Sequence, residues 1–508
     1  MVIIDALKSF LNVDAVQFTL AIVIAWGVAT SCWNAYKRNK RLPPLVPYTS
    51  PVAGSTAEYI QNPRQFVDKI FEKYGSVVRV NIFGRILVVL DYEFSRMLFT
   101  TPDWNFDKGT QENTNLDYHL RLGTHTTTAT SHAAVATYIT PNLKKYTPRV
   151  VKQLDRIIKL RVGETIETVI IDNPKKLFQE MIANAMANVF VGEHLSNDPQ
   201  MVDVFMQLSG DINTMILRWR SSTFKPWERL KSRFNSIVDK HRDILLKKLN
   251  TDSDRRIKQK EEMGPEKWEK EKPLDVIQGM MDKSIQERGA PNLNESIYTT
   301  MGLIFASVDT TTTGSSWVLF MLAKHTEYHQ ELLEEIKKCV EANRSEEGEL
   351  GVDAIKSMVK LDSFCKEVLR IRGDGIVLNH KATKDVILPN GVLIPKGIHV
   401  ATAMYRTHIN DEIQIGGPAN EFRPFRFVGE NKSATKVAGD WILFGLGRHA
   451  CPGRFLAIQE IKTIVCLILG NYEISLPDGD FKYPNLAFTF NLPPIGRIAF
   501  KRRPEPIF

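Results

Sequence analysis

The order of apolar and polar residues predicts a chain built mostly of helices. The segment 294–323 is apolar all round, with few charges and no proline, and is expected to form a helix buried in the middle of a domain. Asp309 and the threonines that follow it interrupt this pattern with groups that compete for backbone hydrogen bonds. Further helices are predicted over 141–171, 175–191, 234–249, 325–343 and 352–371, and another begins near Gly453.

Strand signals are fewer and shorter. Residues 77–90 alternate around a glycine, and 385–397 contain Asn-Gly between two apolar runs, so both segments are predicted to be β-hairpins. After Gly470 the chain has the pattern of short strands and turns. Residues 251–273 are mostly charged and are expected to form an exposed loop or helix with a solvated face. The predicted fold class is mainly α with a minor β region.

A separate apolar segment lies near the N-terminus. Residues 15–36 contain no charged side chain and are long enough, at about 1.5 Å per residue, to cross a bilayer core of about 30 Å. Four basic residues follow within 37–41, which predicts that the rest of the chain faces the cytosol. The alternative, a cleaved signal peptide, usually has a shorter apolar run and a small-residue cleavage site. We therefore expect a membrane anchor over 1–41 and one large domain over 42–508.

Composition narrows the class of protein. Of the 508 residues 43% are hydrophobic and 24% are charged, so the chain is neither disordered nor fibrous. Five cysteines in a chain of this length argue against a disulfide scaffold. The formal net charge is +8, but no dense basic tract with interleaved aromatic residues occurs, so nucleic acid is not expected as a partner.

The candidate chemistry centres on Cys451. This cysteine lies in FGLGRHACPGRF (444–455), among glycines that allow turns and directly before a predicted apolar helix. The helix N-terminus and the neighbouring Arg448, His449 and Arg454 favour a thiolate, which can act as a nucleophile or bind a metal.

Three other interpretations of this stretch are possible. A phosphate-binding loop would end in Gly-Lys-Ser/Thr, which this one does not. A cysteine hydrolase needs a positioned histidine and an Asn or Asp, which a single sequence does not reveal. A structural cysteine would be expected in an apolar run, as Cys466 is.

The pattern Phe444-x-x-Gly447-x-His449-x-Cys451-x-Gly453 closely resembles the haem-binding signature of the cytochrome P450 family. The resemblance implies haem b with the Cys451 thiolate as the axial iron ligand, which pushes electron density onto the iron. It implies that His449, where many members carry Arg, pairs with a haem propionate. It covers nearly the whole chain and implies the cytochrome P450 fold, preceded here by one N-terminal transmembrane helix. The sequence around Cys451 is similar to that of the fungal, microsomal secondary-metabolite branch of the family.

Two further motifs follow the family's order. Glu367 and Arg370 resemble its E-x-x-R, whose spacing puts both side chains on one face of a helix. Arg426, within FRPFRF (422–427), resembles the arginine that completes a buried cluster with them. The resemblance implies that these three residues hold the haem loop in shape.

The central helix carries ASVDTT (306–311), which is similar to the family's A-G-x-D/E-T-T. The resemblance gives catalytic roles to Thr310, in hydrogen bonding to oxygen, and to Asp309, in relaying the protons that O–O cleavage consumes in a dry pocket. Ser307 departs from the family by replacing the usual Gly. On the early helix, His132 stands for the usual aromatic residue and Ala136 occupies the usual basic position.

The resemblance implies a membrane-anchored haem-thiolate monooxygenase that catalyses RH + O₂ + 2e⁻ + 2H⁺ → ROH + H₂O. Electrons would come from NADPH through NADPH–cytochrome P450 reductase, with cytochrome b5 as a further partner. The implied location is the endoplasmic reticulum membrane, crossed once and in contact with its lipid, with the catalytic domain facing the cytosol. The implied substrate is an apolar small molecule, such as a terpenoid or a related fungal secondary metabolite.

By the same resemblance, the pocket walls come from 103–130, 205–219, 300–309, 373–380 and 487–492. These segments contain the apolar residues Phe205, Met206, Met215, Leu217, Ile304, Phe305, Ile376, Val377, Phe488 and Phe490. Two rival functions stay open: an isomerase or dehydratase of the same fold that needs no reductase, and a non-catalytic haem protein or membrane-tethered scaffold. Retention of Asp309 and Thr310 favours the monooxygenase.

Overall fold

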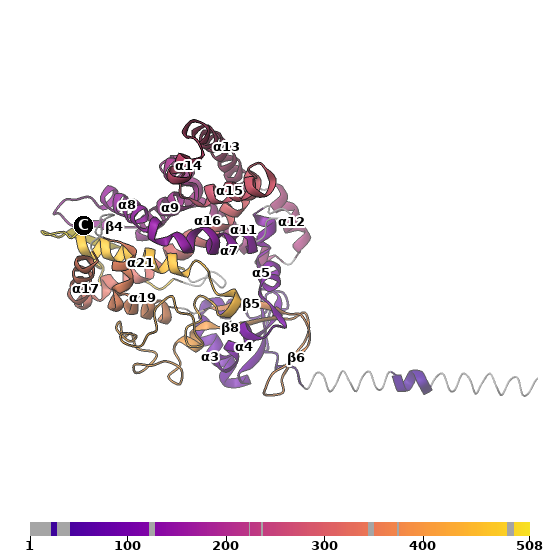
Figure 1. Cartoon of the computed structure of the whole chain (residues 1–508). Helices are drawn as coiled ribbons and strands as arrows, with labels where there is room; N and C mark the ends of the chain where they lie inside the picture. The colour runs from indigo at the N-terminus through magenta and orange to yellow at the C-terminus, as the bar shows by residue number, and fades with distance from the viewer. Residues whose placement is uncertain are drawn as a thin grey trace, which may run out of the picture.

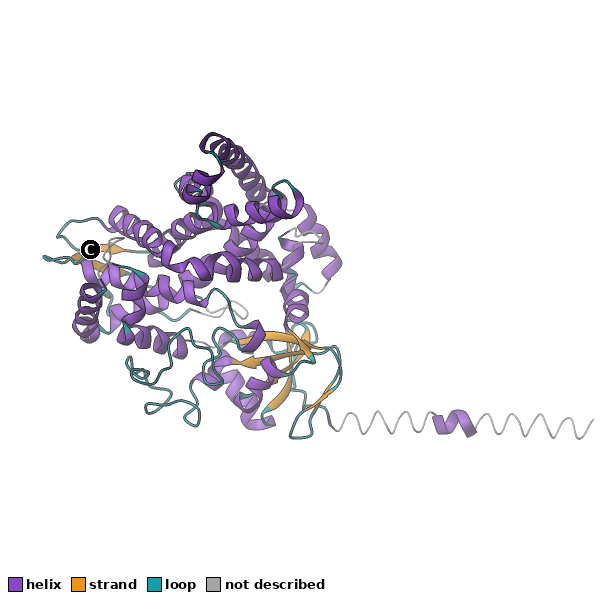
Figure 2. Ribbon diagram, in the orientation of Figure 1, coloured by secondary structure: helices purple, strands orange, loops and turns teal. Residues whose placement is uncertain are grey.

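Helices form the larger lobe of the molecule and a sheet forms the smaller one (Figures 1 and 2). This computed structural model describes residues 22–27, 41–120, 128–222, 224–234, 237–343, 350–372, 375–484 and 492–508. The prediction of a mainly helical chain with a minor sheet is confirmed.

The helices follow one another along the chain with few long gaps. In the first half they are α2 (Thr56–Gln61), α3 (Pro63–Tyr74), α4 (Tyr92–Thr100), α5 (Phe106–Thr114), α6 (Leu116–His119), α7 (Thr128–Ala134) with a π-helical turn (Val135–Ile139), α8 (Leu143–Val162), α9 (Pro174–Val191), α10 (Glu193–Ser196), α11 (Pro199–Ser221) and α12 (Lys225–Phe234). In the second half they are α13 (Ile237–Met263), α14 (Pro265–Glu271), α15 (Val276–Arg288), α16 (Leu293–Lys324), α17 (His329–Ala342), α18 (Val352–Ser357), α19 (Val359–Ile371), α20 (Met404–His408) and α21 (Arg454–Asn471). Short 3₁₀ turns occupy Thr140–Asn142, Thr326–Tyr328 and Gly447–His449.

The main sheet has the strand order β1-β2-β8-β5-β3. Its strands are β1 (Val77–Ile82), β2 (Arg85–Leu90), β3 (Trp104–Asn105), β5 (Ile376–Ala382) and β8 (His399–Ala403). The predicted hairpin over 77–90 is confirmed, since β1 and β2 pair antiparallel from Val77 with Leu90 to Ile82 with Arg85. The second predicted hairpin forms β6 (Val386–Ile387) and β7 (Leu393–Ile394). A third sheet joins β4 (Val169–Ile171), β10 (Ile498–Arg502) and β9 (Tyr472–Ser475).

Helix α16 is the predicted buried helix, and it runs through the helical lobe against α9, α11, α13, α19 and α21. Its 32 residues give a length of about 48 Å. The hydroxyls that could have disturbed it donate back to carbonyls one turn earlier: Ser307 Oγ to Leu303 O and Thr310 Oγ1 to Ala306 O, both at 2.7 Å. The helix therefore stays continuous while it places polar side chains inside the molecule.

Two of the predicted helices end or break earlier in the structure than expected, and the one expected over 234–249 extends instead to Met263 as α13. The helix expected over 141–171 ends at Val162, because Gly163 takes a φ of 82° there, and the chain then enters strand β4. The helix expected over 352–371 is broken at Met358 into α18 and α19.

The charged run 251–273 is not simply a solvated face. It forms the end of α13 and α14, and its Arg256 is buried between Asp252 and Asp275, with Nε 2.6 Å and Nη2 2.9 Å from their carboxylates. A buried ion network of this kind has the same composition as a surface one, so the composition alone misled the interpretation.

The predicted membrane segment 15–36 falls largely outside the described residues, and within it residues 22–27 are helical. Among the helices of the described residues, none combines the length and the apolar character needed to cross a membrane.

Candidate active site

The loop before α21 folds back on itself and presents Cys451. Gly445 and Gly447 take φ values of 70° and 65°, which residues with a Cβ rarely adopt. The resulting turns bring the Cys451 backbone N–H to within 2.7 Å of Phe444 O. Cys451, Phe444 and Gly453 thereby line the same cavity.

The electrostatics at Cys451 differ from the sequence expectation of a thiolate. Burial raises the pKa of the Cys451 thiol, and it outweighs the backbone amides of Gly453 and Arg454 and the charge of Arg454, which act in the opposite direction. The amides of the helix N-terminus and Arg454 thus act in the predicted direction, toward a thiolate, but burial has the larger effect in the bare chain. A bound metal cation supplies the missing charge and deprotonates a coordinating thiol.

The cavity beside Cys451 has a volume of about 250 Å³ and lies between the loop and α16. Its α16 wall contains Gly302, Leu303, Phe305, Ala306, Ser307, Thr310 and Thr311. The remaining walls are Leu116, Leu120, Ser131, His132, Val135, Ile139, Phe190, Phe444, Cys451, Pro452, Gly453, Leu456, Ala457 and Glu460. The structure thus brings Thr310 and Cys451, 141 positions apart in the sequence, to one largely apolar cavity.

Asp309 and Thr310 face different surroundings although they are neighbours. Thr310 is exposed to the cavity. The Asp309 carboxylate is turned to α9 and α11, where it accepts hydrogen bonds from Asn213 Nδ2 at 3.0 Å and Gln179 Nε2 at 3.4 Å. Burial raises the pKa of Asp309, while the charge of Lys175 and the Asn213 hydrogen bond act to lower it.

His449 lies at the edge of the site and outside the cavity lining. Its ring packs on Phe106 with centroids 5.5 Å apart, and Phe106 packs in turn on His380 at 5.2 Å. Burial lowers the pKa of His449. His132 lines the cavity, with Nε2 3.4 Å from Ala450 O, whereas Ala136 lies in the π-helical turn.

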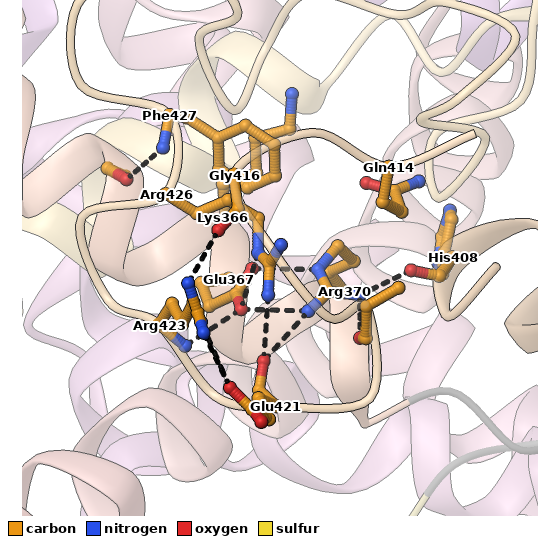
Figure 3. A network of polar contacts seen from close by, with 12 residues as sticks. Lys366, Glu367, Arg370, His408, Gln414, Gly416, Glu421, Arg423, Arg426 and Phe427 are labelled. Atoms are coloured by element: carbon orange, nitrogen blue, oxygen red, sulfur yellow. Dashed lines mark hydrogen bonds and ion pairs between the residues drawn. The ribbon is translucent and has the colours of Figure 1, made fainter. Parts of the chain in front are cut away.

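Glu367, Arg370 and Arg426 meet in one buried network (Figure 3). Glu367 Oε2 accepts from Arg370 Nε at 2.7 Å, and its Oε1 accepts from Arg426 Nε and from the backbone N–H of Arg423, each at 3.0 Å. Other guanidinium N–H groups of the two arginines donate to backbone carbonyls of the irregular segment after α20: Ile415, Gly417, Pro418, Ala419 and Glu421.

This network is tied to the Cys451 loop through two residues. Arg370 Nη1 donates to the backbone O of His408, whose ring Nε2 accepts from Ile442 N–H at 3.1 Å. Gln414 Nε2 donates to Asp440 O at 2.8 Å. Both contacts hold the segment 440–442, which leads into Phe444.

The family model for cytochrome P450 matches residues 43–497. The chain belongs to the cytochrome P450 family. It is 28% identical to cytochrome P450 monooxygenase 151 of Postia placenta over 72% of this chain and 74% of that protein. It is 28% identical to cytochrome P450 monooxygenase penP of Penicillium crustosum over 69% and 68%. The fold matches the retinoic acid-bound cyanobacterial CYP120A1 with a TM-score of 0.66 at 20% identity, over 91% of this chain and 99% of that one.

As a cytochrome P450 monooxygenase, this chain belongs to a family whose iron is held by haem and a thiolate. The residues present fit that group. The cavity offers the Cys451 thiol as a ligand for the iron, and its walls are mostly apolar.

The sequence predicted only some of the residues that line the cavity of this cytochrome P450. Of the ten apolar wall residues named from the sequence, Phe305 lines the cavity, whereas Phe205 and Ile304 are fully buried in the helical core. Residues 373–374 and 485–491, which include Phe488 and Phe490, lie outside the described residues.

Glu460 was missed altogether. It lines the cavity, its Oε1 is buried without a hydrogen-bond partner among the described residues, and burial raises its pKa well above the usual range. The available signal was a single carboxylate nine residues after Cys451 in a mostly apolar helix.

Proposed function

We propose that this cytochrome P450 is a membrane-anchored monooxygenase that inserts one oxygen atom of O₂ into an apolar small molecule. The substrate class we favour is a terpenoid or related fungal secondary metabolite, and the electrons would come from NADPH through a reductase, with cytochrome b5 as a further donor. The observation that carries the proposal is the shared cavity of Cys451 and Thr310. The fungal monooxygenases among its relatives support the assignment as a monooxygenase.

Four residues would hold the haem. Cys451 would bind the iron through Sγ, Phe444 and Gly453 would pack against the ring, and His449 would pair with a propionate. When bound, the haem supplies the redox chemistry that activates oxygen. The network of Glu367, Arg370 and Arg426 would keep the loop in the shape that presents the thiolate.

The chain's own part in the reaction is to deliver protons and to keep water away. Thr310 presents its hydroxyl to the cavity, and Asp309 on the next position is a carboxyl with a raised pKa that touches polar side chains on α9 and α11. A proton could pass from that polar side to the Thr310 hydroxyl, while the apolar walls exclude bulk water.

A location at the endoplasmic reticulum membrane is supported by α12. Trp227, Leu230 and Phe234 are all exposed and lie on one face of this helix, and Lys231 and Arg233 accompany them. A helix with exposed aromatic and aliphatic residues on one face and basic residues beside them suits a membrane interface.

The test is the reduced, CO-bound difference spectrum of the full-length protein, with Cys451→Ser and the matched variant Cys339→Ser. We expect a strongly red-shifted Soret band that Cys451→Ser loses and Cys339→Ser keeps. An unshifted band in folded wild-type protein would show that the axial ligand is not a thiolate, and the proposal would be refuted. Product formation that needs both O₂ and NADPH with reductase separates the monooxygenase from a reductase-independent isomerase or dehydratase.

A further inference from the structure

Helix α16 presents a second hydroxyl to the cavity beside Cys451, in addition to that of Thr310. Ser307 and Thr310 both line this cavity, and they lie three residues apart on the helix. Side chains with this spacing share one face of a helix, with their Cβ atoms about 5–6 Å apart. A molecule of the size of water, placed in the cavity, can therefore reach either hydroxyl.

Both hydroxyls donate their own hydrogen to the backbone of α16. Ser307 Oγ donates to Leu303 O and Thr310 Oγ1 donates to Ala306 O, each at 2.7 Å. A hydroxyl has one hydrogen and two acceptor lone pairs, so these two groups offer the cavity acceptors. The partner that fits them is a hydrogen-bond donor.

The bond back to the helix is not itself a sign of function. Serine and threonine make it in many helices, and Ser316 Oγ makes it here to Thr312 O at 2.7 Å. Ser316 is fully buried and does not line the cavity. At Ser307 and Thr310, by contrast, the same bond leaves acceptor oxygens on a cavity wall.

A third polar group of the cavity also requires a partner. Glu460 on α21 lines the cavity, and its Oε1 is buried without a hydrogen-bond partner among the described residues. Polar atoms among mostly apolar walls cost free energy unless a hydrogen bond satisfies them. A water molecule in this cavity would satisfy such acceptors through its two hydrogens.

We propose that Ser307 is a second positioning residue, which anchors a water molecule in the cavity in parallel with Thr310, so that proton delivery for O–O cleavage does not depend on Thr310 alone. The inference rests on the proposed function. A water that donates one hydrogen to either hydroxyl oxygen keeps its second hydrogen for the oxygen atom that is reduced. The water passes that proton on and takes up another from the side of Asp309, so it is restored and the two protons of the overall reaction are accounted for.

The test uses carbon monoxide as a probe of the reduced, full-length holoprotein and needs no substrate. The infrared C–O stretching band moves between H₂O and D₂O when the CO accepts a hydrogen bond from an exchangeable hydrogen. We expect this solvent shift in the wild type, in Ser307→Ala and in Thr310→Val, because either hydroxyl alone anchors the water. The double variant Ser307→Ala/Thr310→Val should lose the shift, and Ser307→Thr/Thr310→Val, which keeps one hydroxyl, should retain it.

Turnover gives a second readout. With NADPH and reductase but no substrate, consumed O₂ leaves as H₂O₂ (O₂ + 2e⁻ + 2H⁺ → H₂O₂) or, after O–O cleavage, as water (O₂ + 4e⁻ + 4H⁺ → 2H₂O). The ratio of water to H₂O₂ should fall less than about threefold in each single variant and at least about tenfold in Ser307→Ala/Thr310→Val. Ser316→Ala removes the same kind of bond outside the cavity lining and should match the wild type in both readouts.

Three results would overturn the inference. One is the absence of a solvent shift in the wild type, another is its loss in Ser307→Ala or Thr310→Val alone, and the third is its persistence in the double variant. If Ser307→Ala/Thr310→Val does not load haem, Ser307→Gly/Thr310→Val decides. A normal red-shifted CO band without a solvent shift would refute the role of Ser307 alone, and a missing red-shifted band in the wild type would refute the proposed function.

Discussion

Two carboxylates of this cytochrome P450, Glu367 fully buried and Asp309 partly buried, have opposite surroundings. Glu367 is enclosed by cations: its oxygens accept from Arg370 and Arg426, and its side chain is fully buried. Asp309 accepts from neutral amides, those of Asn213 and Gln179, and its pKa is raised by burial.

The difference distinguishes a carboxylate that holds the structure together from one that can transfer a proton. A carboxylate between two guanidinium groups is fixed in geometry, because moving it leaves two buried cations unpaired. A carboxylate that is hydrogen-bonded by amides can gain or lose a proton without breaking an ion pair, which a proton relay needs. We therefore propose that Glu367 holds the loop in shape and that Asp309 transfers protons, and each of the following experiments could contradict that proposal.

The largest effect is expected from Glu367→Gln. It removes the side-chain carboxylate that bridges Arg370 and Arg426, and breaking a buried pair in this way costs about 3–5 kcal/mol. We expect a lower free energy of unfolding in urea and little haem-loaded protein. Glu421→Gln is the matched control, since its side chain is half exposed and its pair with Arg423 is a surface one, worth under about 1 kcal/mol. Wild-type stability in Glu367→Gln would show that the network is not structural.

Acid should also lower the free energy of unfolding, because His408, next to the network of Glu367, Arg370 and Arg426, then gains a proton. Burial and the charges of Arg370 and Lys366 lower the pKa of His408 to about 3, and its Nε2 must stay unprotonated to accept from Ile442 N–H. The unfolded chain takes up this proton near pH 6.5, so the stability is complete above that pH and is lost progressively as the pH falls toward 3. The pKa difference corresponds to on the order of 5 kcal/mol.

His408→Gln isolates this contribution. The variant should lose less stability than the wild type between about pH 6.5 and pH 4, measured by urea unfolding at each pH. His194→Gln, at an exposed position, should follow the wild-type curve. Parallel acid curves for wild type and His408→Gln would contradict the role of His408.

The sequence predicted well what local patterns determine. The hairpin of β1 and β2 and the long helix α16 follow from alternation, a turn glycine and an unbroken apolar run. Cys451 and Thr310 were found because each belongs to a short linear motif, although their meeting in one cavity required the fold.

What escaped prediction depends on how helices are rotated against one another. Ile304 and Phe305 are neighbours of similar character, yet one is core and the other wall, because successive helical residues point about 100° apart. Arg256 and Glu460 are charged residue types at buried positions, and only the packing partners reveal where such side chains lie.

Asp309→Asn tests the other half of the comparison. Turnover with a coupled reductase should fall about 10- to 100-fold, since the amide cannot relay protons. The melting temperature and the CO-difference spectrum should stay close to wild type, because burial already disfavours the charged form of Asp309. A loss of stability as large as that of Glu367→Gln would place both carboxylates in the same structural class.

The smallest and most specific effect is expected from Asn213→Leu. Asn213 Nδ2 donates to Asp309 Oδ2 at 3.0 Å and acts to lower the Asp309 pKa, so its removal should raise that pKa further. Less of Asp309 is then ionised at a given pH, and the acidic limb of the turnover profile should move to higher pH, with roughly a two- to tenfold loss at about pH 7. Thr214→Val, next on α11 and exposed, should leave the profile unchanged. The shift should vanish in an Asp309→Asn background, because it acts only through that carboxyl; a shift that persists there would mean that Asn213 acts on a different group.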